Sequence, residues 1–205
     1  MRTLLTAAVL LCTFIAGVNC LLCEKCFSVG TTTCSGIYRL CPADVTRCVQ
    51  GLENTTIGNK TYLAAFKDCG TSSIRTTCGK SLSFRTSMLM VQISRTCCNS
   101  DYCNGGDIQA PVVDESPNGY KCTDCFNDQS ADACTTKKEI LCTGQEKECL
   151  ALSGTVTIPG EAANEYSVSG CITKNFCGKG GFRFHGLQLL YDDHMMIKCS
   201  PAIKV

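Results

Sequence analysis

The stretch LLCEKCFSVGTTTCSG, residues 21–36, has a counterpart later in the chain: YKCTDCFNDQSADACT, residues 120–135. Both contain Cys-x-x-Cys-Phe, and six further cysteines of the first half align with six of the second. The eight matched positions are all offset by 99 to 102 residues. Self-similarity at a fixed offset indicates a repeated structural module. The sequence therefore predicts two tandem modules, at residues 21–106 and 120–205.

The join between the repeats, GGDIQAPVVDESPNGY, is rich in Gly, Pro, Asp and Asn and has little apolar periodicity. This composition is typical of an exposed connection, so we assign residues 107–119 to a linker. Modules of about 85 residues are small enough to need covalent help with their stability.

The chain begins with MRTLLTAAVLLCTFIAGVNC, residues 1–20, in which an apolar run extends from Leu4 to Val18. The run is short for a membrane span and suits a secretory signal peptide. Val18 and Cys20 are small residues placed for cleavage before Leu21. Such a cut removes two of the 20 cysteines and leaves 18, an even number. The alternative is a signal anchor that stays attached.

The C-terminal stretch FHGLQLLYDDHMMIKCSPAIKV carries charged residues and lacks the apolar tail that GPI attachment requires. No segment after the leader is apolar over a length that spans a bilayer. We therefore expect a secreted, extracellular protein without a membrane anchor, in an oxidising space where disulfides persist.

Composition narrows the class of partner. Without the leader, Lys+Arg falls from 19 to 18 against 18 Asp+Glu, so the net charge is about zero. The absence of a basic stripe argues against nucleic acid as a partner. The high cysteine content indicates a disulfide scaffold rather than a domain stabilised by its apolar core alone.

Hydrophobic periodicity favours strands. In SLSFRTSMLMVQISRT, Leu89, Val91 and Ile93 fall on one face of a strand, and Gln92 and Ser94 on the other. Leu82 and Phe84 alternate with serines in the same way. We find no helix of more than two turns, so the sequence predicts an all-β fold with long hairpins. The apolar run Met88–Val91 is interpreted as a strand buried between the modules or against the knot, with an adaptable contact surface as the alternative.

The cysteine spacing resembles that of a known family. Cys-x-x-Cys near the start of the chain and Cys-Cys-x(4)-Cys-Asn at residues 97–104 resemble the lymphocyte-antigen-6/urokinase-receptor superfamily of three-finger proteins. In that family a small disulfide knot holds three β-hairpin fingers. The resemblance implies an all-β, disulfide-rich fold of two tandem three-finger (snake-toxin-like) modules. The second module departs from the pattern because it lacks the final cysteine pair and the asparagine.

The resemblance also implies the disulfide pairing, which sequence alone does not determine. In the first module the implied pairs are Cys23–Cys48, Cys26–Cys34, Cys41–Cys69, Cys78–Cys97 and Cys98–Cys103. In the second module they are Cys122–Cys149, Cys125–Cys134, Cys142–Cys171 and Cys177–Cys199. Asn104 is implied to tie the end of the first module back to its knot.

Other uses of these residue types are disfavoured. A zinc ribbon needs a second close cysteine pair, and the later cysteines are too widely spaced. A redox use of Cys23 and Cys26 needs a βαβ context that is absent. His194 stands beside Asp192 and Asp193, but adjacent residues on a strand point to opposite faces. We therefore expect no metal site, no cofactor and no catalytic site.

Two kinds of surface site are predicted. The sequence ENTTIGNKT contains glycosylation sequons at Asn54 and Asn59, in the expected second finger of module one. The corresponding fingertip of module two, TIPGEAANEY, has no sequon and is mildly acidic. Near the C-terminus, aromatic residues flank an arginine, a composition enriched at binding hot spots. This candidate binding surface comprises Phe182, Arg183, Phe184 and Tyr191, and burial in the core is its alternative.

Two functions follow from closer resemblances within the superfamily. The openings LLCEKCFSVGTTTCSGIY and PNGYKCTDCF resemble amphibian sodefrin precursor-like factors, many of which are courtship pheromones. This implies a secreted, non-enzymatic protein that acts intact on a recipient's receptor. The alternative, from the two modules and the missing last pair, is a gamma-type inhibitor of secreted phospholipase A2, in oligomeric form. A third idea is a structural extracellular protein.

Overall fold

The computed structural model describes residues 20–70, 78–112, 114–132, 134, 138–158, 160–176, 188–189 and 195–205. These residues form strands, turns and loops but no helix, which confirms the predicted all-β fold. Accordingly, nothing helical in this part of the chain is long and apolar enough to cross a membrane. The strands of module one are β1 (Leu22–Val29), β2 (Ile37–Leu40), β3 (Cys48–Ile57), β4 (Lys60–Cys69), β5 (Ser81–Arg85) and β6 (Leu89–Cys98).

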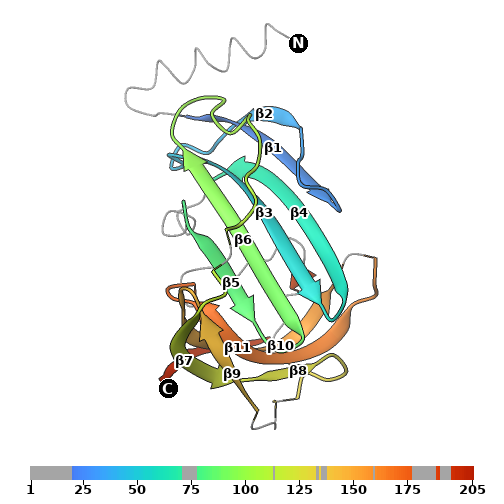
Figure 1. Cartoon of the computed structure of the whole chain (residues 1–205). Helices are drawn as coiled ribbons and strands as arrows, with labels where there is room; N and C mark the ends of the chain where they lie inside the picture. The colour runs from blue at the N-terminus through green and yellow to red at the C-terminus, as the bar shows by residue number, and fades with distance from the viewer. Residues whose placement is uncertain are drawn as a thin grey trace, which may run out of the picture.

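Module one consists of three hairpins, β1–β2, β3–β4 and β5–β6, that together form a sheet in the order β5-β6-β3-β4-β1-β2 (Figure 1). The second hairpin is the longest, and ten residue pairs link β3 to β4. Its turn is only Gly58 and Asn59, and Gly58 has a φ of +56°, a left-handed value that suits glycine in a tight hairpin turn.

Module two repeats this arrangement around β10, which pairs with β11 on one side and with β12 and β13 on the other. Strand β8 lies beside β11, and β7 forms a separate small sheet with β9 and β14. The strands are β7 (Pro117–Thr123), β8 (Cys125–Asn127), β9 (Glu139–Thr143), β10 (Glu146–Thr157), β11 (Asn164–Thr173), β12 (Gln188–Leu189), β13 (Met196–Pro201) and β14 (Ile203–Lys204).

Disulfides gather at the base of the hairpins in each module. Among the described residues the pairs are Cys23–Cys48, Cys26–Cys34, Cys41–Cys69, Cys78–Cys97, Cys98–Cys103, Cys122–Cys149, Cys125–Cys134 and Cys142–Cys171. They coincide with eight of the nine pairs that the resemblance implies. Cys199 is also disulfide-bonded, whereas Cys177 lies outside the described residues.

The knot of module one is itself a small core. Four disulfide-bonded cysteines pack with Leu21 and Val45, all of them buried. The Cys23–Cys48 bond spans a sequence separation of 25 residues. In the chain-entropy model, closing a loop of that size stabilises the fold by about 3 kcal/mol. A module too small for a large core thus gains much of its stability from crosslinks.

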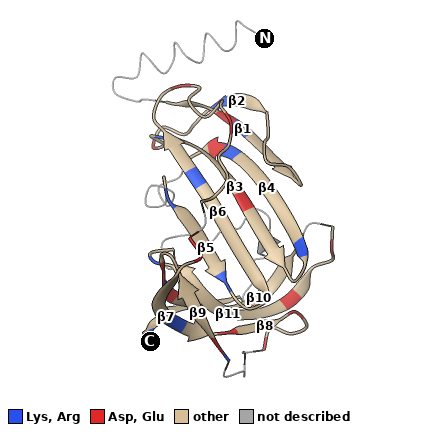
Figure 2. Ribbon diagram, in the orientation of Figure 1, with Lys and Arg blue, Asp and Glu red and all other residues tan. Residues whose placement is uncertain are grey.

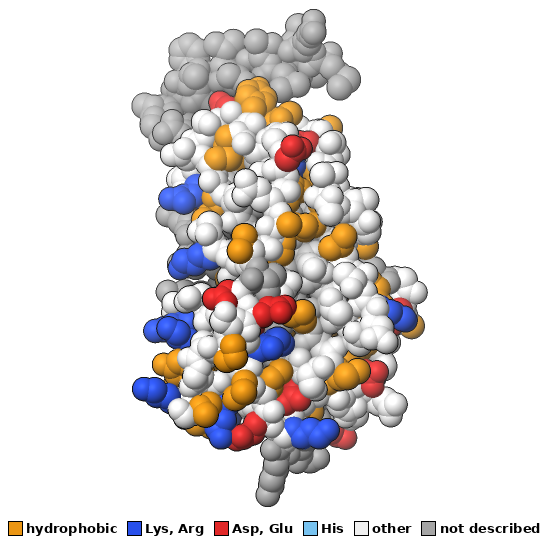
Figure 3. All heavy atoms as spheres, viewed as in Figure 1, with side chains coloured by type: hydrophobic (Ala, Val, Ile, Leu, Met, Phe, Trp, Pro, Cys, Tyr) orange, Lys and Arg blue, Asp and Glu red, His pale blue; other side chains and the backbone are white. Residues whose placement is uncertain are grey.

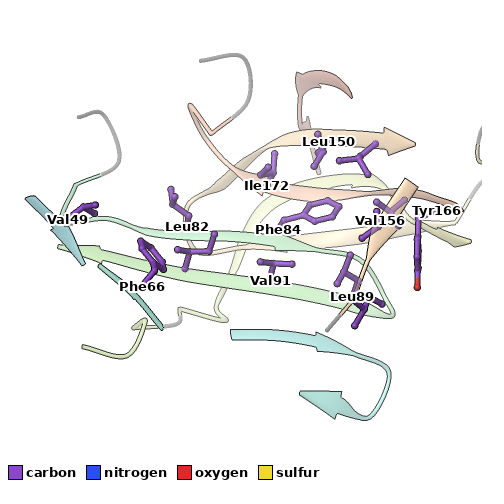
Figure 4. Close-up of a cluster of buried hydrophobic side chains, with 14 residues drawn as sticks. Val49, Phe66, Leu82, Phe84, Leu89, Val91, Leu150, Val156, Tyr166 and Ile172 are labelled. Atoms are coloured by element: carbon purple, nitrogen blue, oxygen red, sulfur yellow. The ribbon is translucent and has the colours of Figure 1, made fainter. Parts of the chain in front are cut away.

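The two modules share one apolar core and one continuous sheet. Strand β5 of module one pairs with β11 of module two through Arg85–Cys171 and Phe84–Ile172. In Figure 4, Phe84 lies between Val91 of β6 and Ile172 of β11. The core comprises Val49, Phe66, Leu82, Phe84, Leu89, Val91, Ile93, Leu150, Leu152, Val156, Ile158, Tyr166, Val168 and Ile172.

The core shows that Leu89 and Val91 of the apolar run are buried, and of the two burial sites that the sequence left open it identifies the junction of the modules. Leu89 and Val91 are buried at the shared core, on the same face as Ile93, while Met88 at the hairpin tip is half exposed. The predicted alternation therefore locates the core-facing side of β6 correctly.

The polar face of β6 is also buried, which the alternation does not predict. Ser94 and Gln92 lie on the face opposite the core, yet both are buried. After its final disulfide, module one sends residues 105–112 back along this face, in front of β3 and β6 in Figure 1. Ser94 Oγ donates a hydrogen bond to the Gln109 carbonyl, and Ile108 packs on the sheet. Residues 105–112, most of which belong to the predicted linker, therefore cover the second face of module one's sheet.

Asn104 ties the end of module one back to the knot, where it contacts the residues that follow the disulfide-bonded Cys23 and Cys48. Its side chain is buried, and Oδ1 accepts a hydrogen bond from the Glu24 backbone N–H at 2.9 Å. Its Nδ2 donates to the carbonyls of Glu24 at 3.0 Å and Val49 at 3.1 Å. One buried amide therefore satisfies three backbone groups of two different strands.

Next to this tie lies a buried ion pair between Lys67 Nζ and Glu24 Oε2, 2.9 Å apart. Burial alone would raise the pKa of Glu24, but hydrogen bonds from Lys67 and from the Gly36 N–H outweigh it and lower that pKa. The carboxylate therefore stays ionised inside the module.

Phe84→Ala should lower the free energy of unfolding by about 3–5 kcal/mol, because it leaves a cavity in a packed core. Because both modules line that cavity, we expect one shared transition in urea, followed by far-UV circular dichroism, to move to lower urea concentration. The control Met88→Ala, at a half-exposed tip, should change stability by less than about 0.5 kcal/mol. Separate unfolding of module two at its wild-type midpoint would contradict the shared core.

Lys67→Met should cost about 3–5 kcal/mol at pH 7, because it leaves the buried Glu24 carboxylate without its cation. The matched control is Lys25→Met, which removes an exposed pair with Asp68 and should cost at most about 1 kcal/mol.

The pH dependence of the same variants gives a second check. In the wild type, the lowered pKa of Glu24 contributes stability above the ordinary value of 4.5, and this stability is lost as pH falls through the lowered pKa. In Lys67→Met the carboxylate has no cation, so its protonation in acid relieves the penalty. The difference in urea midpoint between the two proteins should therefore shrink below pH 4.5; a constant difference would argue against this pair as the cause.

Candidate binding surfaces

The binding surface predicted from sequence, Phe182, Arg183, Phe184 and Tyr191, lies outside the described residues. The same holds for the cluster around His194. The surfaces that the structure does describe come from three other places: the junction of the modules, the tips of their second hairpins, and the second face of module two.

Each knot brings three cysteine sulfurs within 4.8 Å of one another: Cys23, Cys41 and Cys69 in module one, and Cys122, Cys142 and Cys171 in module two. All six are bonded in disulfides. A metal ion binds the thiolate form of cysteine, and an oxidised sulfur does not offer it. The clusters are therefore crosslinks, in agreement with the interpretation of the Cys-x-x-Cys pairs as structural.

The module junction is polar around its apolar core. The N–H of Ser83 in β5 donates to Thr173 Oγ1 at 2.8 Å, and Ser83 Oγ donates to Glu146 Oε1 at 2.8 Å. Glu146 is buried and lies 3.5 Å from Arg85 Nη2, which also donates to a backbone carbonyl of module two. These contacts fix the third hairpin of module one onto module two.

A second junction contact involves a buried carboxylate. Asp124 Oδ1 accepts a hydrogen bond at 2.8 Å from the N–H of Ser87, in the β5–β6 turn. Sequence reasoning gave no sign of these contacts. Ser83, Arg85 and Ser87 are ordinary polar residues of a predicted hairpin, and nothing in their spacing distinguishes an interface from solvent.

The tips of the two long hairpins contact each other. Glu161, in the predicted acidic fingertip of module two, accepts hydrogen bonds from Lys60 Nζ at 3.0 Å and Tyr62 Oη at 3.1 Å. These two bonds lower the pKa of Glu161. The fingertip is therefore directed toward module one, and the exposed Asn59 of the neighbouring turn lies beside this contact.

Module two has an open groove of about 700 Å³ on the sheet face that points away from the shared core. Among the described residues that line it, Lys198 carries the only charge, and most of the lining is small or apolar. Side chains from three neighbouring strands form its floor: Ala151 and Ser153 of β10, Ser167 and Ser169 of β11, and Met196 and Lys198 of β13.

The hydroxyl groups of Ser167 and Ser169 in the groove floor have polar contacts within the module. Ser169 Oγ donates to the Thr123 carbonyl at 3.1 Å, and Ser167 Oγ lies 3.3 Å from the sulfur of Cys134. The floor is therefore a fixed surface of small side chains, with room above it.

Charges do not gather into one large field of a single sign. Figure 2 shows acidic and basic residues distributed along the strands of both modules. On the face seen in Figure 3, both signs are interspersed with hydrophobic side chains.

Comparison with known proteins agrees with the repeat. A model of the u-PAR/Ly-6 domain matches the chain twice, over residues 19–106 and 118–199. Phospholipase A2 inhibitor NAI from Notechis ater is 30% identical over 197 residues, which cover 93% of this chain and 92% of that protein. The gamma chain of a phospholipase A2 inhibitor from Laticauda semifasciata is 29% identical over 187 residues, with coverages of 88% and 96%.

A further relative is the urokinase plasminogen activator surface receptor from Aotus trivirgatus, which is 32% identical over 83 residues, 40% of this chain and 23% of that protein. These matches confirm the superfamily and the two three-finger modules that the cysteine spacing indicates. This chain is therefore a member of the u-PAR/Ly-6 domain family, with two copies of the domain.

Proposed function

We propose that this protein is an extracellular, non-enzymatic inhibitor that binds a secreted phospholipase A2. The observation that carries the proposal is the end-to-end likeness to a phospholipase A2 inhibitor, at 30% identity over 93% of this chain and 92% of that protein. Inhibitors with that activity in their names recur among the relatives, from Laticauda semifasciata, Gloydius brevicaudus siniticus and Malayopython reticulatus. This likeness favours the second of the two functions inferred from sequence.

The architecture supports binding as the mode of action. The shared core and the disulfides hold both modules in one fixed relation, so a partner meets a preorganised surface. Secretion belongs to the same proposal. It rests on the N-terminal leader and on the disulfides, which persist in oxidising compartments.

The test is an activity assay of a secreted phospholipase A2 titrated with residues 21–205, purified with their disulfides intact. We expect a dissociation constant between about 1 nM and 1 µM, the range of specific protein complexes. At enzyme concentrations above that constant, activity should fall linearly and end at a fixed molar ratio, because inhibition by binding is stoichiometric.

Reduced and alkylated protein is the control and should not inhibit. Inactivation of many enzyme molecules by one molecule of this protein would contradict a non-enzymatic action. Full enzyme activity at a large excess of native protein would remove the proposal. In that case, expression confined to a male gland would favour the courtship signal acting on a recipient's receptor.

Glycosylation is part of the proposed extracellular form, and the structure distinguishes the two sequons. Asn59 is exposed in the two-residue β3–β4 turn, whereas Asn54 lies mid-strand between Leu63 of β4 and Gln92 of β6, with its side-chain oxygen buried. In protein secreted from animal cells, we expect Asn59→Gln to remove the mass that glycosidase treatment removes from the wild type. Asn54→Gln should leave that mass unchanged; the reverse pattern would show that accessibility in the fold does not decide use.

A further inference from the structure

The groove of module two corresponds, residue by residue, to a face that module one covers with its own chain. In module one, Ile108 packs against Leu52, Ala65 and the disulfide-bonded Cys34. The equivalent positions in module two are Ser153, Ser167 and Cys134, and all three line the groove.

Strand pairing supports this equivalence independently of the cysteine offset. Leu52 pairs with Ala65 on one side and Ser94 on the other. Ser153 pairs in the same way with Ser167 and Met196. The two faces therefore share one strand register, and they differ in the segment of chain that covers them.

Two sequence differences explain why module two is open. The end of module one, with its Cys98–Cys103 loop and Asn104, directs the chain over its own face. In module two, the residues that follow Cys199 instead form strand β14, which pairs with β7. Beneath the cover, module one has a buried Glu24–Lys67 pair, where module two has the smaller Thr123 and Ser169.

We infer that the groove of module two binds an extended peptide segment of a partner protein, in which an acidic residue precedes a β-branched aliphatic residue. Module one shows the chemistry that this face accepts. Ile108 fills the hollow over β3 and β4, while Gln50 Nε2 and Ser94 Oγ donate to the carbonyls of Asp107 and Gln109.

The charge of the ligand follows from the same register. Asp107 lies over Gln50, whose equivalent in module two is Ala151, and Ala151 pairs with Lys198. A residue in the position of Asp107 would therefore lie next to the one charged side chain of the described lining, which favours a carboxylate. The smaller floor of module two leaves space for the aliphatic residue that follows, and the exposed, flexible side chain of Met196 can adapt to it.

The probe is the synthetic peptide GGDIQAPV, the sequence of residues 105–112, titrated into the full disulfide-bonded protein labelled with ¹⁵N. The amide signals of Ser153, Ser167 and Met196 should shift and saturate. Those of Leu52 and Ala65 should not, because the tethered linker already holds that face at a high effective concentration. Peptides in which Asp is replaced by Lys, or Ile by Gly, should bind more weakly.

Ala151→Trp should fill the groove from an exposed position and weaken peptide binding at least about tenfold. Its matched control is Ala162→Trp, at an exposed site outside the groove, which should leave the affinity unchanged. Lys198→Gln should weaken binding by a few-fold and remove most of its dependence on salt, as expected when an exposed charge pair is lost, whereas Lys204→Gln should do neither.

Four results would overturn the inference: no shifts at millimolar peptide, shifts confined to module one, equal affinity for the Ile-to-Gly peptide, or unchanged affinity in Ala151→Trp. A dimer that Ala151→Trp dissociates in sedimentation velocity would identify a second copy as the occupant instead. Binding of a fluorescent fatty acid in the groove, without binding of the peptide, would identify an acyl chain as the occupant. Either result also contradicts the peptide.

Discussion

The packing of the third hairpin of module one onto the sheet of module two is the contact on which the architecture depends. Phe84 enters the core from β5, and the same strand pairs with β11. Next to Phe84, the side chains of Ser83 and Arg85 contact the buried Glu146. The same strand therefore contributes both apolar burial and polar contacts to the junction. The disulfides shape each module, but this contact fixes the position of one module relative to the other. The geometry of every surface that both modules form therefore depends on this contact.

Much of this fold could be predicted from the sequence, because its strongest signals are local or periodic. The offset of the cysteines identified the repeat, and the alternation of Leu89, Val91 and Ile93 located the buried face of β6. The pairing of β5 with β11 left no such signal, since it joins residues distant in sequence through two residue pairs. The burial of Ser94 was likewise hidden, because it depends on where the linker runs.

The candidate surfaces were harder to predict than the fold. Aromatic residues near an arginine drew attention to residues 182–184, because hot spots have that composition. The floor of the groove in module two has a different composition: three serines, an alanine, a methionine and a lysine, none of which stands out in a sequence. Its meaning becomes visible only when the register of β10 and β11 is compared with that of β3 and β4. Because its floor carries smaller side chains than the equivalent face of module one, the groove has space for a ligand.

A tandem duplication gives two identical modules. In each of them, the second face of the sheet must be shielded from solvent. Here residues 105–112 cover that face in module one, whereas the residues after Cys199 in module two pair through β14 with β7. Substitutions on the covered face of module one must keep fitting residues 105–112, which are tethered to it. Substitutions on the groove face of module two are constrained only by solubility and by the molecule that binds there. We therefore expect the two faces to diversify at different rates among descendants of the same ancestral gene.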